Sequence, residues 1–248
     1  MRFRVLSWNI HKGIGGLDRR YRPERTLEVI RHYRPDLVLM QEVDEGVRRS
    51  SFHRQVDVLG DALELRHRSY GPNVKLRRGR YGNATLSRWP LTHITNIDLT
   101  LKPKKRRGAL YTRLRVRIGR HTRTLVVLNL HLGLAGFERS IQLKRLLKHQ
   151  LLAGLHGRTP VLLAGDFNDP SDTLGPRLLQ PAGFRRAGTA RATYPAFWPL
   201  RPLDGIFVRG DLKRVRAWAS RMDSARAASD HLPILADLSI GATGQART

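Results

Sequence analysis

The sequence predicts a protein of the α/β class, and two observations support this. A buried strand, an amphipathic helix and a second buried strand follow one another twice, once in each half of the 248-residue chain. Between the two halves, shorter segments alternate apolar and polar residues, as half-buried antiparallel strands do. No Pro-rich or Ser-rich linker divides the chain. We therefore predict one domain over residues 1–240 and a small, polar, disordered tail over residues 241–248.

The first strand-helix-strand unit occupies the amino-terminal part of the chain. Alternating apolar positions predict a strand over residues 3–10, and a glycine-rich turn follows at residues 13–16. Residues 23–33 have the apolar spacing of a helix that ends before a proline. A short apolar run at residues 37–40 predicts the next strand, which leads into Gln41 and Glu42.

The second unit lies after a middle group of strands. Its parts are a strand at 124–130, a helix at 138–155 and a strand at 161–164. Antiparallel strands are predicted before it at 83–87, 94–101 and 109–118, and after it at 204–209, 213–219 and 234–240. In segment 109–118 arginines alternate with aliphatic residues, which predicts one buried and one solvated face.

Composition narrows the class of partner. The chain has 46 Lys and Arg against 20 Asp and Glu, a net charge of +26. Such a charge attracts nucleic acid or an anionic lipid surface, although an arginine-rich proteome alone also produces it. The absence of Cys excludes disulfides and thiolate metal sites. We find no secretory signal and no apolar run of the ~20 residues that cross a bilayer. We expect a cytoplasmic monomer, and nothing indicates a protein partner.

Four strand ends carry acidic or amide side chains: Asn9, Glu42, the segment 166–168 and the segment 230–231. Polar groups at the ends of buried strands need pairing, water or a metal. Glu42 and Asp166 converging would form an all-oxygen site for Mg²⁺ or Mn²⁺, with Asn9 as a neutral ligand. Each residue alone has an ordinary alternative, such as a turn, a helix cap or a solvated loop.

Taken together, these residues resemble the endonuclease/exonuclease/phosphatase superfamily. The resemblance runs from residue 3 to residue 238 and consists of ordered motifs: Trp8-Asn9, Gln41-Glu42, Asn129-Leu130-His131, Gly165-Asp166-Phe167-Asn168, Asp204 before an apolar strand, and Ser229-Asp230-His231. It implies a four-layer α/β/β/α sandwich of two mixed β-sheets flanked by helices. It also implies a hydrolase that acts on phosphoester bonds with a divalent metal ion.

The resemblance further implies roles for individual residues. Glu42 is the expected main metal ligand, with Asn9 and Asp230 near the metal. His231 is expected to act as general base or to polarise the phosphate, while Asp166 orients the attacking water. Asn168 is expected to bind a phosphate oxygen. His131, oriented by Asp204, is expected to act as an acid or a hydrogen-bond donor.

Three further residues are implied as substrate contacts: Asn83, Arg107 and Asn129. For Arg107 a solvated position in the basic loop 102–107 is an alternative. Arg201 stands one place early for the family pattern and is left out, and His11 is expected to be a loop residue.

The sequence therefore predicts a metal-dependent phosphodiesterase, and its charge favours nucleic acid as the substrate of an endonuclease-like enzyme. One alternative is a phospholipid or phosphoinositide phosphoesterase at an anionic membrane surface, with residues 197–200 as a small insertion loop or, equally, as part of the core. A second alternative is a basic nucleic-acid-binding module without catalysis.

Overall fold

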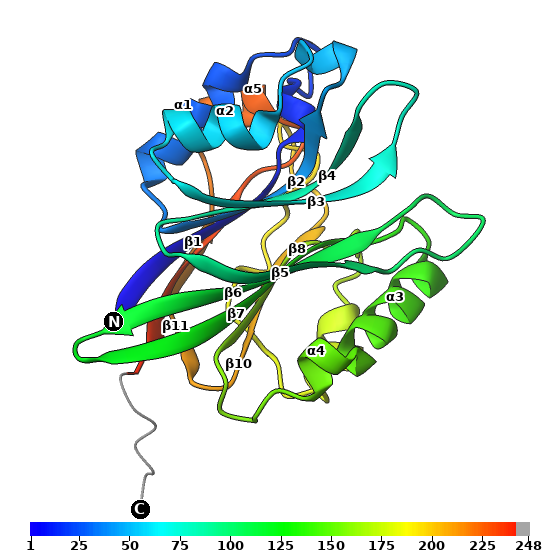
Figure 1. Ribbon diagram of the computed structural model, residues 1–248. Helices are drawn as coiled ribbons and strands as arrows, with labels where there is room; N and C mark the ends of the chain where they lie inside the picture. Colours follow the sequence, from blue (N-terminus) through cyan, green and yellow to red (C-terminus); the bar gives the residue numbers. More distant parts are fainter. Residues whose placement is uncertain (242–248) are drawn as a thin grey trace, which may run out of the picture.

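Two six-stranded β-sheets pack face to face, with helices on both outer surfaces, in the computed structural model, which describes residues 1–241 (Figure 1). The predicted four-layer sandwich is thereby confirmed. The predicted tail, apart from Gly241, lies outside the described residues.

The first sheet has the strand order β11-β12-β1-β2-β4-β3. β1 pairs in parallel with β2 and antiparallel with β12, so the first and last strands lie side by side. Helices α1, α2 and α5 cover its outer face (Figure 1). The bounds are β1 Arg2–Asn9, α1 Pro23–Tyr33, β2 Leu37–Glu45, α2 Gln55–Ala62, β3 His67–Lys75, β4 Arg80–Ser87, β11 Leu212–Ala219, α5 Asp223–Ala228 and β12 Ile234–Ile240.

The second sheet has the strand order β5-β6-β7-β8-β10-β9. β7 and β8 are parallel, and α3 and α4 cover part of its outer face (Figure 1). The bounds are β5 Leu91–Asp98, β6 Gly108–Ile118, β7 His121–His131, α3 Gly136–Lys148, α4 Gln150–Ala153, β8 Val161–Asp166, β9 Arg185–Arg186 and β10 Asp204–Arg209. Short helical turns lie at η1 His11–Gly13, η2 Arg48–Ser50 and η3 Gly175–Leu179.

The core has three layers, because each sheet is buried on both faces. Between the sheets, Leu39 of β2 packs in one cluster with Val127 of β7 and Leu162 of β8. Separate clusters lie under the helices of each outer face. Strands buried on both faces need apolar residues at every position, which explains the continuous runs at 37–40, 125–128 and 161–164.

Several local features differ from the sequence prediction. The helix expected at 138–155 is broken at His149, whose backbone is extended, with ψ 134°, and whose ring accepts a hydrogen bond from the Leu151 amide. The strand expected at 37–40 continues through a β-bulge to Glu45. Helix α2 and strand β3, which are 8 and 9 residues long, were not predicted, because their apolar residues are few and irregularly spaced.

The parallel pairs β1–β2 and β7–β8 end at the same edge of the sandwich. The loops that join β3 to β4 and β5 to β6 project from this edge (Figure 1). Within the described residues, no helix combines the length and apolar character needed to cross a bilayer.

Candidate active site

A cavity of about 450 Å³ opens at this edge, between the ends of the two sheets. Eight of the residues selected from the sequence line it: Asn9, Glu42, Arg107, His131, Asp166, Asn168, Asp230 and His231. They come from the ends of β1, β7 and β8, from the bulge of β2, from the loop after β8, from the loop between β5 and β6, and from the loop between α5 and β12. The fold thus gathers motifs that are up to 222 positions apart, the separation of residues 9 and 231.

A buried hydrogen-bonded pair at the wall of the cavity joins His231 to Asp204. Nδ1 of His231 lies 2.9 Å from Oδ2 of Asp204, which also accepts a hydrogen bond from Thr193 Oγ1. The expectation that Asp204 orients His131 was therefore wrong: it orients His231. β10 pairs antiparallel with β8 and places Asp204 directly opposite Asp166, which brings its carboxylate under the His231 ring.

Asp166 is buried at the centre of the cavity. Its Oδ2 accepts a hydrogen bond from Asn9 Nδ2 at 3.0 Å, and its Oδ1 accepts one from the Asn168 amide at 2.9 Å. The Nε2 atoms of His131 and His231 lie 3.5 and 3.8 Å from the same Oδ2. Burial raises the pKa of Asp166 to about 6, although the neighbouring His231 acts to lower it.

The two histidines differ in protonation. Burial and the Arg107 guanidinium hold the pKa of His131 well below its ordinary value, so this ring is neutral at pH 7. Burial also acts to lower the pKa of His231, but Asp204 and Asp166 outweigh it and raise the pKa to about 10. Without a metal ion, His231 is therefore an imidazolium, which donates from both nitrogens.

Glu42 lies at the β-bulge of β2. The pairing with β4 shifts between Met40 and Val43, and Glu42 adopts a left-handed backbone, with φ 57°. Bulges re-aim side chains, and this one directs the carboxylate into the cavity. There it contacts the Lys12 ammonium. Burial acts to raise the pKa of Glu42, but the charge and hydrogen bond of Lys12 outweigh it, and the pKa is lowered to about 2.

Buried hydrogen bonds join the end of β1 to the loop before β12, which carries His231. The Trp8 indole donates a hydrogen bond to the His231 carbonyl at 2.7 Å, and the Ser229 hydroxyl donates one to the Asn9 carbonyl at 2.7 Å. These hydrogen bonds explain why Trp8 accompanies Asn9, and Ser229 accompanies His231, in the sequence motifs. Gly165 permits β8 to approach β7 closely, since a Cβ there would collide with the Leu130 carbonyl of β7.

The cavity fits a hard divalent cation. Asn9, Glu42, Asp166 and Asp230 supply oxygen atoms within one cavity, and Glu42 already takes a cationic partner, Lys12. A second group that could hold a metal consists of Asp166, Asp204 and His231, whose ligand atoms all lie within 4.8 Å of one another. In this second group, Asp204 Oδ2 already accepts hydrogen bonds from His231 and Thr193.

Two of the expected substrate contacts lie outside the cavity. Asn129 is fully buried, and its Nδ2 donates to the carbonyls of Met40 and Ala84, at 3.0 and 2.9 Å. Asn83 Nδ2 donates to the carbonyls of Gly108 and Asn129. These amides join the two sheets, so the expectation that they bind substrate is corrected. In the sequence, a polar residue in a buried strand looks the same whether it joins two sheets or binds a substrate.

Arg107, in contrast, lies in the cavity rather than in a solvated charge run. It is only 6% exposed, and among the described residues its Nε has no hydrogen-bond partner and the guanidinium forms no ion pair. An unpaired buried cation is costly, so this position calls for an anion.

Sequence reasoning missed several residues that line the cavity: His11, Lys12, Lys105, Tyr194 and Arg201. His11 and Arg201 had been considered and set aside. Lys12 follows Asn9 by three positions, and the backbone at His11 and Lys12 is left-handed, with φ 45° and 64°, which no periodicity reveals.

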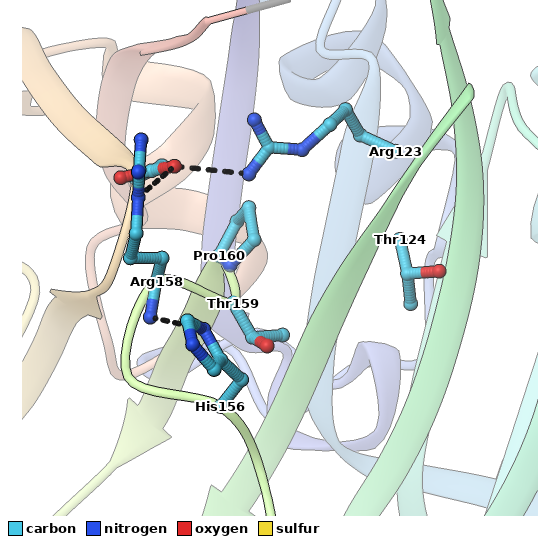
Figure 2. A pocket seen from close by; sticks show the side chains of 7 residues that line it. Arg123, Thr124, His156, Arg158, Thr159 and Pro160 are labelled. Atoms are coloured by element: carbon cyan, nitrogen blue, oxygen red, sulfur yellow. Dashed lines mark hydrogen bonds and ion pairs between the residues drawn. The ribbon is translucent and has the colours of Figure 1, made fainter. Parts of the chain in front are cut away.

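A second cavity, of about 300 Å³, lies at the opposite end of β7 and β8 (Figure 2). Arg123 and Arg158 point toward one carboxylate there, that of Asp211, at 3.1 and 3.4 Å. Its charged groups are thus paired with one another.

Comparisons of the sequence with known proteins show its family. The sequence model of the endonuclease/exonuclease/phosphatase family matches residues 6–231. The chain is 32% identical to the uncharacterized protein YbhP of Escherichia coli (strain K12), over 95% of this chain and 96% of that protein.

Solved structures with the same fold include an endonuclease/exonuclease/phosphatase from Beutenbergia cavernae DSM 12333, with a TM-score of 0.79 and 24% identity over 99% of this chain and 74% of that chain. Another is ANGEL2, a 2′,3′-cyclic phosphatase in complex with adenosine-2′,3′-vanadate, with a TM-score of 0.74 and 15% identity over 97% of this chain and 96% of that chain.

Fold and cavity define the class of a phosphoester hydrolase. The chain belongs to the endonuclease/exonuclease/phosphatase family.

Proposed function

We propose that this chain is a divalent-metal-dependent phosphodiesterase. The observation that carries the proposal is the cavity itself, which places an unpaired, buried Arg107 beside the His231–Asp204 pair and the carboxylate of Asp166. A phosphodiester is an anion that repels hydroxide. Its hydrolysis needs charge neutralisation, a base for water, and donors to the phosphoryl oxygens.

Each need has a candidate residue. Asn9, Glu42 and Asp230 would hold Mg²⁺ or Mn²⁺, which supplies neutralisation of charge on the phosphoryl group. Asp166, whose pKa of about 6 lies near neutrality, is placed to orient water and accept its proton. His231, held by Asp204, and Arg107 donate to the phosphoryl oxygens. Asn168 and the neutral His131 complete the polar wall of the cavity.

The substrate has two candidates that share the phosphodiester group. The net charge of +26 favours nucleic acid, which we propose as the first candidate. A phospholipid is the second, and a specific observation favours it: Phe197 and Trp198 are 53% and 67% exposed, not part of the core, on a loop beside the cavity. The cytoplasmic location and monomeric state expected above stay predictions.

The experiment measures hydrolysis of bis(4-nitrophenyl) phosphate, plasmid DNA, RNA and phospholipid vesicles in one Mg²⁺ or Mn²⁺ buffer. EDTA should abolish turnover. Asp166→Ala and His231→Ala should each lower it on the order of 100- to 10,000-fold. His156→Ala in the second cavity is the matched control and should keep full activity.

Metal binding has its own readout. Mn²⁺ should raise the melting temperature of the wild-type chain and leave that of Glu42→Gln unchanged, because Glu42 is the proposed main ligand. Full activity of both catalytic variants, or full activity in EDTA, would refute the proposed chemistry. Binding of DNA without turnover of any phosphoester would point to the non-catalytic alternative.

A further inference from the structure

Large apolar side chains are exposed around the mouth of the candidate active site. Within residues 1–241, eleven such side chains are exposed, and six of them lie on three segments that border the cavity. We call these six the apolar rim: Leu17, Leu134, Phe137, Phe197, Trp198 and Leu200. Soluble surfaces carry single exposed apolar residues, but a group around a functional cavity marks an interaction surface.

The contacts of each segment place it at the mouth. Leu134 lines the cavity and is 75% exposed, and Phe137 follows it in the first turn of α3. Tyr194 and Arg201 also line the cavity, and the amide of Arg201 donates to the Tyr194 carbonyl at 2.9 Å. The rim residues 197–200 are therefore the tip of a loop that closes at the cavity.

Leu17 reaches the mouth from the other side. Its neighbour Gly16 packs so closely on Asp230 that a Cβ would lie 2.9 Å from the Asp230 Cα. Leu17 itself is 66% exposed. The rim is thus built from segments that follow β1, β7 and β9, on separate parts of the chain.

Exposed basic side chains stand between these apolar positions. Lys102, Lys104, Lys105 and Arg106 occupy the loop between β5 and β6, which projects from the same edge (Figure 1). The Lys104 ammonium lies 6.0 Å from the Phe137 ring. Arg19, Arg20 and Arg22, all exposed, follow Leu17 in the sequence. The acidic side chains in these segments are neutralised or hidden, since Asp18 pairs with Arg25 and Glu138 is buried.

We propose that the apolar rim inserts into the headgroup region of an anionic lipid bilayer, with the basic side chains on the lipid phosphates and the cavity facing the membrane. Aromatic and basic residues alone would also suit single-stranded nucleic acid, whose bases stack on rings. The aliphatic tips Leu17, Leu134 and Leu200 offer no stacking surface, whereas acyl chains accept them. The docking is independent of the proposed hydrolysis; only the further step, that a headgroup phosphodiester enters the cavity, rests on it.

Trp198 supplies a direct probe of this docking. It is 67% exposed, whereas Trp8 is fully buried and the other two tryptophans are half-buried. Vesicles of phosphatidylcholine mixed with phosphatidylglycerol should bind the full chain, shift Trp198 emission to the blue and, when brominated in the acyl chains, quench it. Phosphatidylcholine alone should bind more weakly, and added salt should weaken the anionic case.

Variants separate docking from folding and from catalysis. Trp198→Ser/Leu200→Ser should lower vesicle affinity by about tenfold or more, because two apolar side chains no longer become buried in the bilayer. Cosedimentation with vesicles measures this affinity. Its hydrolysis of bis(4-nitrophenyl) phosphate should stay at the wild-type rate. The matched control is Ile94→Ser/Val215→Ser, which removes two apolar residues, 51% and 45% exposed, from β5 and β11, and should bind like wild type. Lys104→Gln/Arg106→Gln should weaken binding to anionic vesicles only.

Two results would overturn the docking: equal vesicle affinity of the rim variant and its control, or no vesicle binding while a single-stranded oligonucleotide binds and shifts Trp198 emission. The second result would assign the rim to nucleic acid. Vesicle binding without hydrolysis of any phosphodiester would refute the proposed function and leave the docking intact.

Discussion

Replacing Asp204 by Asn tests the assignment on which the proposed chemistry depends most. Asp204 is 2% exposed and touches the cavity only through His231. Asn has nearly the same shape, so Thr193 and the fold keep a partner, while the negative charge under the imidazole is lost. The variant therefore separates charge and orientation from packing.

The size of the effect follows from the pKa of His231. Burial acts to lower this pKa, and Asp204 is the first of the groups that outweigh burial and raise it to about 10 from 6.5. In Asp204→Asn, only Asp166 and Asp230 still oppose burial, so the pKa should fall by about one unit or more, each unit being worth 1.36 kcal/mol. Turnover should fall on the order of 100- to 10,000-fold, which is the usual effect of removing or misorienting a general acid or base.

Two measurements check this. NMR titration of the His231 ring in the metal-free chain gives its pKa, and hydrolysis of bis(4-nitrophenyl) phosphate in saturating Mn²⁺ gives turnover. Asp211→Asn, which removes a carboxylate from the second cavity, is the control and should change neither (Figure 2). An unchanged His231 pKa together with wild-type turnover in Asp204→Asn would refute the role given to this pair.

Three further predictions concern groups around the cavity. Asn129→Ala should lower the free energy of unfolding by about 2 to 4 kcal/mol in urea titrations, because it removes hydrogen bonds to Met40, Ala84 and Gln41. The folded fraction should keep its turnover. A raised KM without destabilisation would restore the assignment of Asn129 as a substrate contact. Arg107→Met should raise KM for the diester by about 10- to 100-fold without loss of stability, because its charge is unpaired until an anion binds; unchanged KM would contradict this. His231 should make the metal-free chain less stable as pH rises: its folded pKa lies above the unfolded value, so its contribution is complete below pH 6.5 and is lost as pH rises through about 10. His231→Gln should flatten this decline in urea titrations between those pH values, and an equal decline in both proteins would contradict the assignment.

Much of the fold was accessible from the sequence because buried parallel strands leave a strong signal. The runs at 37–40, 125–128 and 161–164 are apolar at every position, and helix α1 has the predicted bounds, Pro23–Tyr33. The apolar pattern did not predict the structure where contacts between distant residues determine it. His149 breaks the expected long helix with one extended residue, and β3 is a mixed polar strand held in place by its pairing with β4.

In the candidate site too, some features could be predicted from the sequence and others could not. Ordered motifs identified seven residues that line the cavity, because carboxylates and histidines at strand ends are rare without a function, and Arg107 was singled out separately from the basic loop. The motifs did not reveal which histidine faces Asp204, since this depends on the register between β8 and β10. Nor did they separate Asn129, which joins the sheets, from residues that face the cavity, because alternation along a strand gives the face of the sheet but not what covers it.

The register between β8 and β10 also explains why charges accumulate at one edge. Asp204 stands directly opposite Asp166, and both are buried. Two carboxylates so close repel one another unless a cation lies between or beside them, and here His231 does so, with Nδ1 on Asp204 and Nε2 toward Asp166. Arg107 and Lys12 bring further positive charge to the same cavity, and of these two only Lys12 has a carboxylate partner. An anionic substrate therefore enters a cavity in which the cations that it needs are already held in place, and the charge that it brings completes the pairing of Arg107.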